Sequence, residues 1–156
     1  MGLDMYLNAR QFMSPYLDDK DGARINKINK MFDLKKVDHF DRPIAANTVI
    51  FEIAYWRKAN AIHAWFVQNV QDGKDECQAS YVSREKLQEL LDLCKEVLEH
   101  RGLAPKLLPS TNGFFFGSTV YDDWYFDNIK FTAKRLDYVL NDPRFKRMEF
   151  EYQASW

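Results

Sequence analysis

The sequence predicts an α+β fold of one domain, residues 1–156, in which a mostly antiparallel sheet packs against about three main helices. Near both ends of the chain apolar and polar residues alternate, which is the period of a half-buried strand. Between the ends, apolar residues recur at spacings of three and four, which is the period of a helix with one buried face. The order of these segments favours a single sheet that includes both terminal strands.

Three segments are expected in the first third of the chain. Residues 3–12 alternate and predict a strand. Residues 23–34 place apolar side chains at helical spacing, although this segment is short and irregular structure is the alternative. Residues 48–56 are rich in β-branched and aromatic residues and predict a second strand. Because both faces of this strand are apolar apart from Glu52, we expect it at the centre of the sheet.

The middle of the chain predicts two helices and a short strand. From Ala59, the residues Ile62, His63, Phe66 and Val70 follow at i+3, i+4, i+7 and i+11 on one helix face, so a helix is expected that ends before Asp72 and Gly73. A short strand at 78–82 precedes the clearest helix, for which Ser83 is the expected N-cap. Gly102 is expected to end that helix.

The last third predicts a turn, a helix and a strand. Asn112 and Gly113 form a tight-turn signal, and residues 114–116 are then an extended segment or short strand. Thr119 with Asp122 three residues later resembles a capping box, so a helix is expected from there to about residue 140. Residues 145–156 alternate again and predict the final strand.

Composition and charge exclude several classes of protein. The 22 Lys and Arg residues nearly balance the 23 Asp and Glu residues, so no overall field attracts nucleic acid or an anionic membrane. The start lacks the pattern of a signal peptide, and no span approaches the roughly twenty apolar residues that cross a bilayer. Cys77 and Cys94 form no CxxC motif, and a reduced pair in a cytoplasmic protein is the simplest interpretation.

The familiar catalytic and metal-binding motifs are missing from the sequence. It contains no GxSxG, HExxH or GxxxxGK[ST] motif. Asp38, His39 and Asp41 could offer a metal three side chains, but a solvated loop is the preferred interpretation because nothing supplies further ligands. We therefore predict no metal, no cofactor and no catalytic residues.

The first candidate site lies where residues 55–63, YWRKANAIH, pass from strand to helix. Arg57 and Lys58 stand near a helix N-terminus, where the helix dipole disfavours cations by some tenths of a kcal/mol. A bound anion such as phosphate would resolve this conflict. The alternatives are a tolerated surface pair, or Arg57 pairing with an acidic neighbour. Likewise, His63 is either a satisfied core histidine or a ligand contact.

The second candidate site is residues 113–126, GFFFGSTVYDDWYF. Gly117, Ser118 and Thr119 place hydroxyls and backbone amides at another expected helix start, which suits an anion. The nearby rings of Tyr121 and Trp124 could stack on a base. A capped helix and ordinary core packing are the alternatives, although they explain the glycines less readily than the rings.

Four blocks of the sequence resemble a family of small phage and prophage proteins. The blocks are GLDMYL at the start, EIAYWRKANAIHAWFVQNVQDG from Glu52, YVSREKLQELLDLCKEVL from Tyr81, and GFFFGSTVYDDWYF. The resemblance implies a setting, namely a protein acting in the cytoplasm of an infected bacterial cell. It implies no catalytic residues.

Our leading hypothesis is a non-catalytic counter-defence or host-modulating protein that binds a phosphate-bearing small molecule, such as a nucleotide signal, in an aromatic-lined pocket. One alternative is an inhibitor that binds a host protein through an aromatic patch, and another is a nucleotide-processing enzyme that uses His63. A homo-oligomer could build the pocket between subunits. The predicted ligand contacts, by role, are Arg57 for the anion, Ser118 and Thr119 for hydroxyl and amide contacts, Trp56, Tyr121 and Trp124 for stacking, and Asn60 and His63 for orientation.

Overall fold

The computed structural model describes residues 2–14, 16, 18–34, 44–113 and 116–156. Its contacts divide the chain into two compact units. The first unit comprises Met1–Ala9 and Glu52–Trp156, and the second comprises Arg10–Phe51. The candidate metal ligands at 38–41 and the rings at 114–115 lie outside the described residues.

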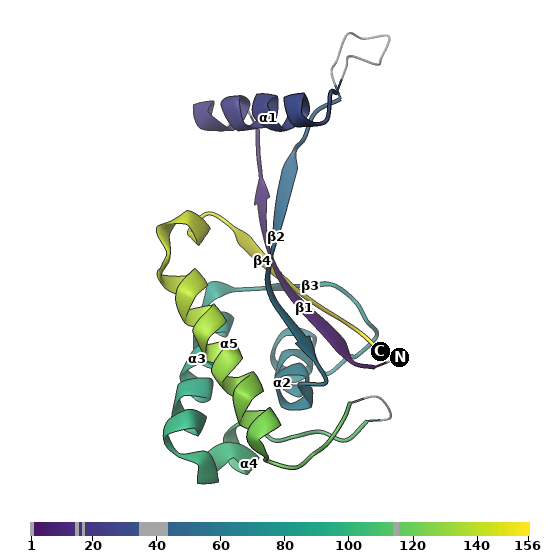
Figure 1. Cartoon of the computed structure of the whole chain (residues 1–156), viewed down its shortest axis with the longest axis vertical. Helices are drawn as coiled ribbons and strands as arrows, with labels where there is room; N and C mark the ends of the chain where they lie inside the picture. The colour runs from purple at the N-terminus through teal and green to yellow at the C-terminus, as the bar shows by residue number, and fades with distance from the viewer. Residues whose placement is uncertain (1, 15, 17, 35–43, 114–115) are drawn as a thin grey trace. The chain divides into compact units, whose positions relative to one another are not determined.

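Among the described residues, the sheet has four strands in the order β2-β1-β4-β3, with antiparallel neighbours (Figure 1). Its strands are β1 (Asp4–Phe12), β2 (Thr48–Arg57), β3 (Ser80–Val82) and β4 (Glu149–Ser155). The register of β3 on β4 pairs Tyr81 with Glu151. The predicted α+β class is therefore confirmed, with both terminal strands in a mostly antiparallel sheet.

The prediction that β2 lies at the centre of the sheet is wrong, because β2 forms one edge. The apolar residues of β2 are divided between the two units, and only some of them are buried. Ala54 and Trp56 are buried in the first unit, whereas Ile50 and Phe51 belong to the second unit and are exposed. A strand that passes between two units can thus look apolar on both faces without being covered on both.

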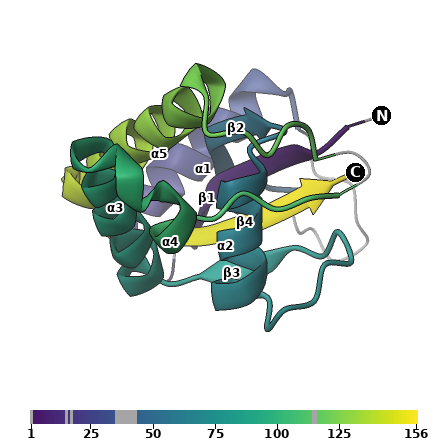
Figure 2. The ribbon, with the colours of Figure 1, turned by 90° about the horizontal axis from the view of Figure 1, so that it is seen from below.

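The three main helices expected from the sequence are present in the first unit. They are α2 (Asn60–Val70), α3 (Arg84–Glu99) and α5 (Asp123–Asn141). The structure adds the short α4 (Ala104–Leu107), and residues 23–34, for which a helix or irregular structure was expected, fall largely within α1 (Asp19–Met31) of the second unit. Helices α3 and α5 lie side by side in both views (Figures 1 and 2).

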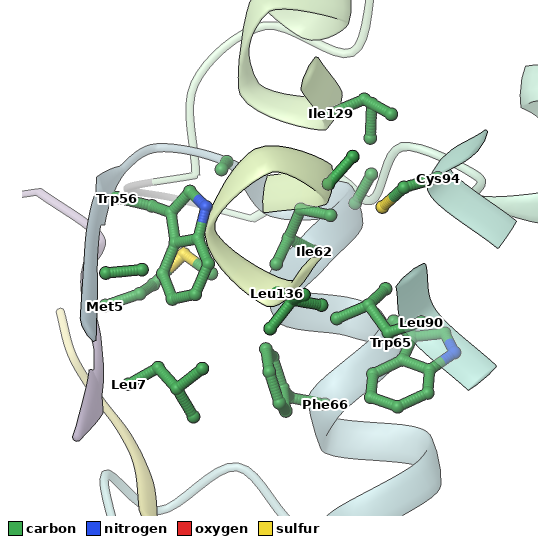
Figure 3. Close-up of a cluster of buried hydrophobic side chains, with 14 of the residues drawn as sticks. Met5, Leu7, Trp56, Ile62, Trp65, Phe66, Leu90, Cys94, Ile129 and Leu136 are labelled. Atoms are coloured by element: carbon green, nitrogen blue, oxygen red, sulfur yellow. The ribbon is translucent and has the colours of Figure 1, made fainter. Parts of the chain in front are cut away.

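One hydrophobic core joins the helices of the first unit to the sheet (Figure 3). Alternate residues of β1, among them Met5 and Leu7, are fully buried, as the period-two pattern predicts. The ring of Phe66 on α2 stacks on Tyr152 of β4 with centroids 3.9 Å apart. Among the described residues, every member of this core belongs to the first unit.

The helix ends confirm one predicted cap and correct two other predictions. Ser83 caps α3, because its hydroxyl accepts the Lys86 backbone N–H at 3.2 Å. Thr119 does not cap α5; Asp122 does, through a carboxylate oxygen that accepts the Tyr125 backbone N–H at 3.0 Å. Gly102 does not end α3 either, since the helix stops at Glu99 and Gly102 lies in the following 3-10 turn.

The second unit is built around α1. This helix begins four residues before the expected start at 23, because Asp18 caps it by accepting the Lys20 backbone N–H at 2.9 Å. Asp21 is buried and accepts hydrogen bonds from Arg24 and from the Ser14 backbone N–H. These bonds give the small unit a fixed polar interior, with Ile25 as its buried apolar residue on the helix.

Candidate functional site

The start of α2 holds the loop between α4 and α5, which is described at residues 108–113 and 116–122. Part of this loop lines a pocket of the first unit. Asn60 is buried, and its side-chain oxygen accepts the Thr111 backbone N–H at 3.1 Å. Its side-chain nitrogen donates to the carbonyls of Phe116 and Ser118 at 3.1 and 2.8 Å. The side-chain amide of Asn60 thus bonds to the loop at Thr111 and again at Phe116 and Ser118. We expect removal of this amide to leave these three backbone groups unpaired.

The glycines that bracket the three phenylalanines serve this loop. A Cβ at Gly113 would lie 2.5 Å from the Phe116 ring, so only glycine allows that ring to approach the backbone. Gly117 has a φ of +85°, and a Cβ there would meet the side chain of Lys58 at 3.1 Å. Both glycines are therefore explained by turn geometry and close packing inside the protein.

His63 is buried next to the loop and belongs to a chain of hydrogen bonds that runs from the buried Tyr152 to the exposed Trp156. Its Nδ1 lies 2.8 Å from the Tyr152 hydroxyl and its Nε2 lies 2.9 Å from Oδ2 of Asp75. The other carboxylate oxygen of Asp75 accepts the indole N–H of Trp156 at 3.1 Å. Phe116 meets the imidazole edge-on, with centroids 5.0 Å apart.

The protonation of Tyr152 decides whether its hydroxyl can donate to His63. Burial, and secondarily the negative charge of Asp75, raises the pKa of Tyr152 well above its ordinary value, so the phenol keeps its proton. The hydroxyl can then donate to Nδ1 of His63, which leaves Nε2–H to donate to Asp75. In this arrangement both ring nitrogens of His63 are engaged within the protein.

The pocket beside His63 has a volume of about 340 Å³, within the size range of small-molecule sites. Most of its lining is apolar, and Asp75 brings a carboxylate to it. No Lys or Arg is among the described residues that line it. The lining residues are Ala61, His63, Ala64, Trp65, Val67, Gln68, Asn69, Asp75, Leu107, Leu108, Pro109, Thr111 and Phe116.

The start of α5 supports the far wall of this pocket. The Tyr125 hydroxyl donates to the Leu108 carbonyl at 2.7 Å, and burial raises the pKa of Tyr125 so that it remains a donor. The Tyr121 hydroxyl accepts the Ser110 backbone N–H at 3.1 Å, while its ring meets Tyr125 edge-on. Tyr121 was predicted to stack on a ligand. In the structure it supports the pocket wall through its hydrogen bond to Ser110.

Other predicted contacts gather at a much smaller cavity. Asn60, Ser118 and Trp124 help to line a space of about 20 Å³ between the starts of α2 and α5. Such a volume has room for about one water molecule and none for a nucleotide. Residues of the first turn of α2 border this cavity, but no phosphate fits into the space as it stands.

The remaining predicted contacts lie apart from both cavities. Trp56 is buried, and its indole N–H donates to Thr132 Oγ1 at 2.8 Å, so the predicted stacking of Trp56 on a ligand is corrected to a core role. Arg57 is exposed at the end of β2. Thr119 is also exposed, and its carbonyl accepts the Ser110 hydroxyl at 2.8 Å.

Sequence reasoning missed Asp75 and the wall formed by Leu107, Leu108 and Pro109. Asp75 lies in an irregular segment, where neither periodicity nor motif marks it as a partner for His63. The run Ala104–Leu107 is a four-residue helix, too short to show a period. The sequence did contain a signal, because Leu107 and Leu108 form a short apolar run before Pro109 and lie outside every predicted helix or strand.

Comparisons with protein-family models, with curated proteins and with solved structures gave no match to this chain. Within the described ranges, no group of three or more His, Cys, Asp or Glu side chains is arranged to hold a metal ion. The same ranges include no helix with both the length and the apolar character needed to span a bilayer.

Proposed function

We propose that this protein binds a small molecule in the 340 Å³ pocket beside His63, and that the ligand is a planar heteroaromatic ring with N–H donors, such as a nucleobase. The observation that carries this proposal is an apolar pocket with one carboxylate at its wall. Trp65 and Phe116 offer ring surfaces to a flat ligand. Asp75 retains lone pairs beyond those used by His63 and Trp156, and these favour an N–H donor.

A nucleotide satisfies this chemistry through its base. No cation is among the described lining residues, so the phosphate of a nucleotide would point out of the pocket toward solvent. Gln68 and Asn69, which are both exposed, form a polar rim along which a ribose could pass. We therefore expect a nucleoside and its phosphate ester to bind with similar affinity.

Binding without catalysis is the function that the hydrogen bonds favour. A general acid or base needs a titrating atom that can reach the substrate. Both nitrogens of His63 are engaged, and Tyr152 is fully buried. In the setting implied by the resemblance to phage proteins, the cytoplasm of an infected bacterium, such a protein would sequester a nucleotide signal and so act in counter-defence.

The test is calorimetric titration of the whole protein with adenosine, guanosine, cytidine and uridine, and with their monophosphates. We expect one nucleoside to bind at one site per chain. Ala64→Phe should abolish that binding, because Ala64 is a partly exposed lining residue and the larger ring would fill the pocket without removing a native contact. Ala64→Ser is the matched control and should bind normally.

A second variant tests the role of the carboxylate. Asp75→Asn should weaken nucleoside binding by about 1.5–3 kcal/mol, the usual value of a hydrogen bond to a charged group. Naphthalene, which has a similar shape and no N–H, should bind equally to the wild type and to this variant. Binding of every nucleoside to Ala64→Phe as tightly as to the wild type, or no nucleoside binding at all, would refute the proposed function.

A further inference from the structure

The second unit exposes an unusual amount of apolar surface. Among the described residues, eight of the fourteen exposed large apolar side chains lie in Arg10–Phe51, which is about a quarter of the chain. Singly scattered apolar residues need no explanation, but a concentration of them on a small unit is typical of an interaction surface. These eight are Phe12, Tyr16, Met31, Phe32, Leu34, Ile44, Ile50 and Phe51.

Four of these side chains lie at or near the C-terminal end of α1, namely Met31, Phe32, Leu34 and Ile44. Met31 and Phe32 are 74% and 70% exposed. The Asn29 side chain accepts the Ala46 backbone N–H at 2.9 Å, which brings the segment after residue 43 against the helix. Leu34 and Ile44 accordingly line one open hollow together with Lys27 and Lys30.

Among the residues of α1 whose burial the structure describes, the exposed charges are positive. Lys20, Lys27 and Lys30 are exposed, whereas Asp21 is buried and paired with Arg24. Asp33, just beyond the helix, is the exposed acid beside the hollow. We call the side chains of Lys20, Lys27, Lys30, Met31, Phe32, Leu34 and Ile44 the α1 surface.

We infer that the α1 surface docks an acidic amphipathic segment of a partner protein. Lysines beside exposed Met and Phe side chains match a partner that offers carboxylates beside an apolar stripe. A second copy of this chain fits poorly, because it would bring the same lysines face to face. This inference is independent of the pocket beside His63, which lies wholly in the first unit.

Two other classes of partner match the surface less well. Single-stranded nucleic acid binds through stacked aromatic rings, whereas three of the four apolar members of the α1 surface are aliphatic. A membrane-bound helix inserts an apolar face along its whole length. In α1 the apolar residue Ile25 is buried inside the unit and is not available for insertion. The exposed side of the helix carries Lys20, Lys27 and Lys30.

The experiment measures binding of the full chain to a fluorescein-labelled 18-residue peptide of Leu and Glu arranged as an amphipathic helix. The control peptide has Lys in place of every Glu. We expect the acidic peptide to bind, the basic peptide not to bind, and NMR shift changes to map to α1 and residues 31–34 and 44. The double variant Lys27→Glu/Lys30→Glu should bind at least tenfold more weakly.

The matched control is Lys130→Glu/Lys134→Glu, a reversal of two exposed lysines on α5 that should leave binding unchanged. Circular dichroism of both variants checks that they fold. The inference is overturned if the acidic peptide fails to bind, if both peptides bind equally, or if the shift changes fall outside the α1 surface. Tighter binding to a 20-residue oligothymidine or to anionic vesicles, or dimerisation in place of peptide binding, would also overturn it.

Discussion

Single polar side chains fix the irregular parts of this protein. Asn60 closes the loop over the pocket with three hydrogen bonds. Asp142 does similar work where α5 ends, since its carboxylate accepts hydrogen bonds from the side chain and the backbone N–H of Arg144. These bonds lower the pKa of Asp142 to about 2, from an ordinary value of 3.8.

Asp142 therefore predicts a pH dependence of stability. Because its pKa is lower in the folded protein than in the unfolded chain, the ionised carboxylate stabilises the fold above about pH 4. That contribution is lost as the pH falls through about 2. Asp142→Asn should lower the free energy of unfolding at neutral pH, and its difference from the wild type should shrink between pH 4 and pH 2.

Thermal unfolding followed by calorimetry across this pH range measures the difference. Asp127→Asn, the same change at an exposed acid of α5, is the control for the loss of one surface charge. A difference between Asp142→Asn and the wild type that stays constant down to pH 2 would contradict the assignment.

At the scale of elements, periodicity predicted which helices and strands are present better than it predicted where they end and which strands are neighbours. The patterns behind β1, β4, α2, α3 and α5 follow from burial on one face, and each element is present. Ends and neighbours depend on contacts that local patterns do not contain. β2 lies at an edge of the sheet although both its faces are apolar, and α5 begins where Asp122 rather than Thr119 supplies the cap.

The cap of α5 gives a direct comparison. Asp122→Ala should destabilise the protein by about 0.5–2 kcal/mol, because the Tyr125 backbone N–H loses its acceptor. Thr119→Ala is the matched control and should change stability by less than about 0.5 kcal/mol, since its side chain is exposed. Urea unfolding of the two variants measures both values, and a larger loss in Thr119→Ala would reverse the assignment of the cap.

The candidate site was only partly predictable for a related reason. Asn60 and His63 were singled out from their place at the start of a helix, and both border the loop or the pocket. Their roles could not be predicted, because each depends on partners far along the chain. Asn60 bonds to residues more than fifty positions away, and His63 bonds to Tyr152 at a separation of 89.

At the scale of the whole molecule, the core of the first unit is closed without the second. None of the described residues of Arg10–Phe51 joins that core, and the segment connects two neighbouring strands, β1 and β2. We predict that replacing residues 10–51 with Asn-Gly, a two-residue hairpin turn, leaves the first unit folded.

The measurement is the two-dimensional amide NMR spectrum of the shortened chain. Signals of α2, α3, α5 and β4 should stay dispersed and close to their positions in the full protein. The same replacement combined with Leu7→Asp, which places a charge in the core, is the negative control and should collapse the spectrum. Collapse of the shortened chain without that mutation would contradict the prediction.

The distribution of tryptophan allows unfolding of the first unit to be followed by fluorescence separately from the second unit. Trp56 and Trp65 are buried in the first unit, Trp124 and Trp156 are exposed there, and Arg10–Phe51 contains no tryptophan. Indole emission consequently reports the unfolding of the first unit alone, while the far-ultraviolet signal also includes α1. A chemical quencher would further separate the two buried indoles from the two exposed ones, so the unlabelled protein already carries its own reporters.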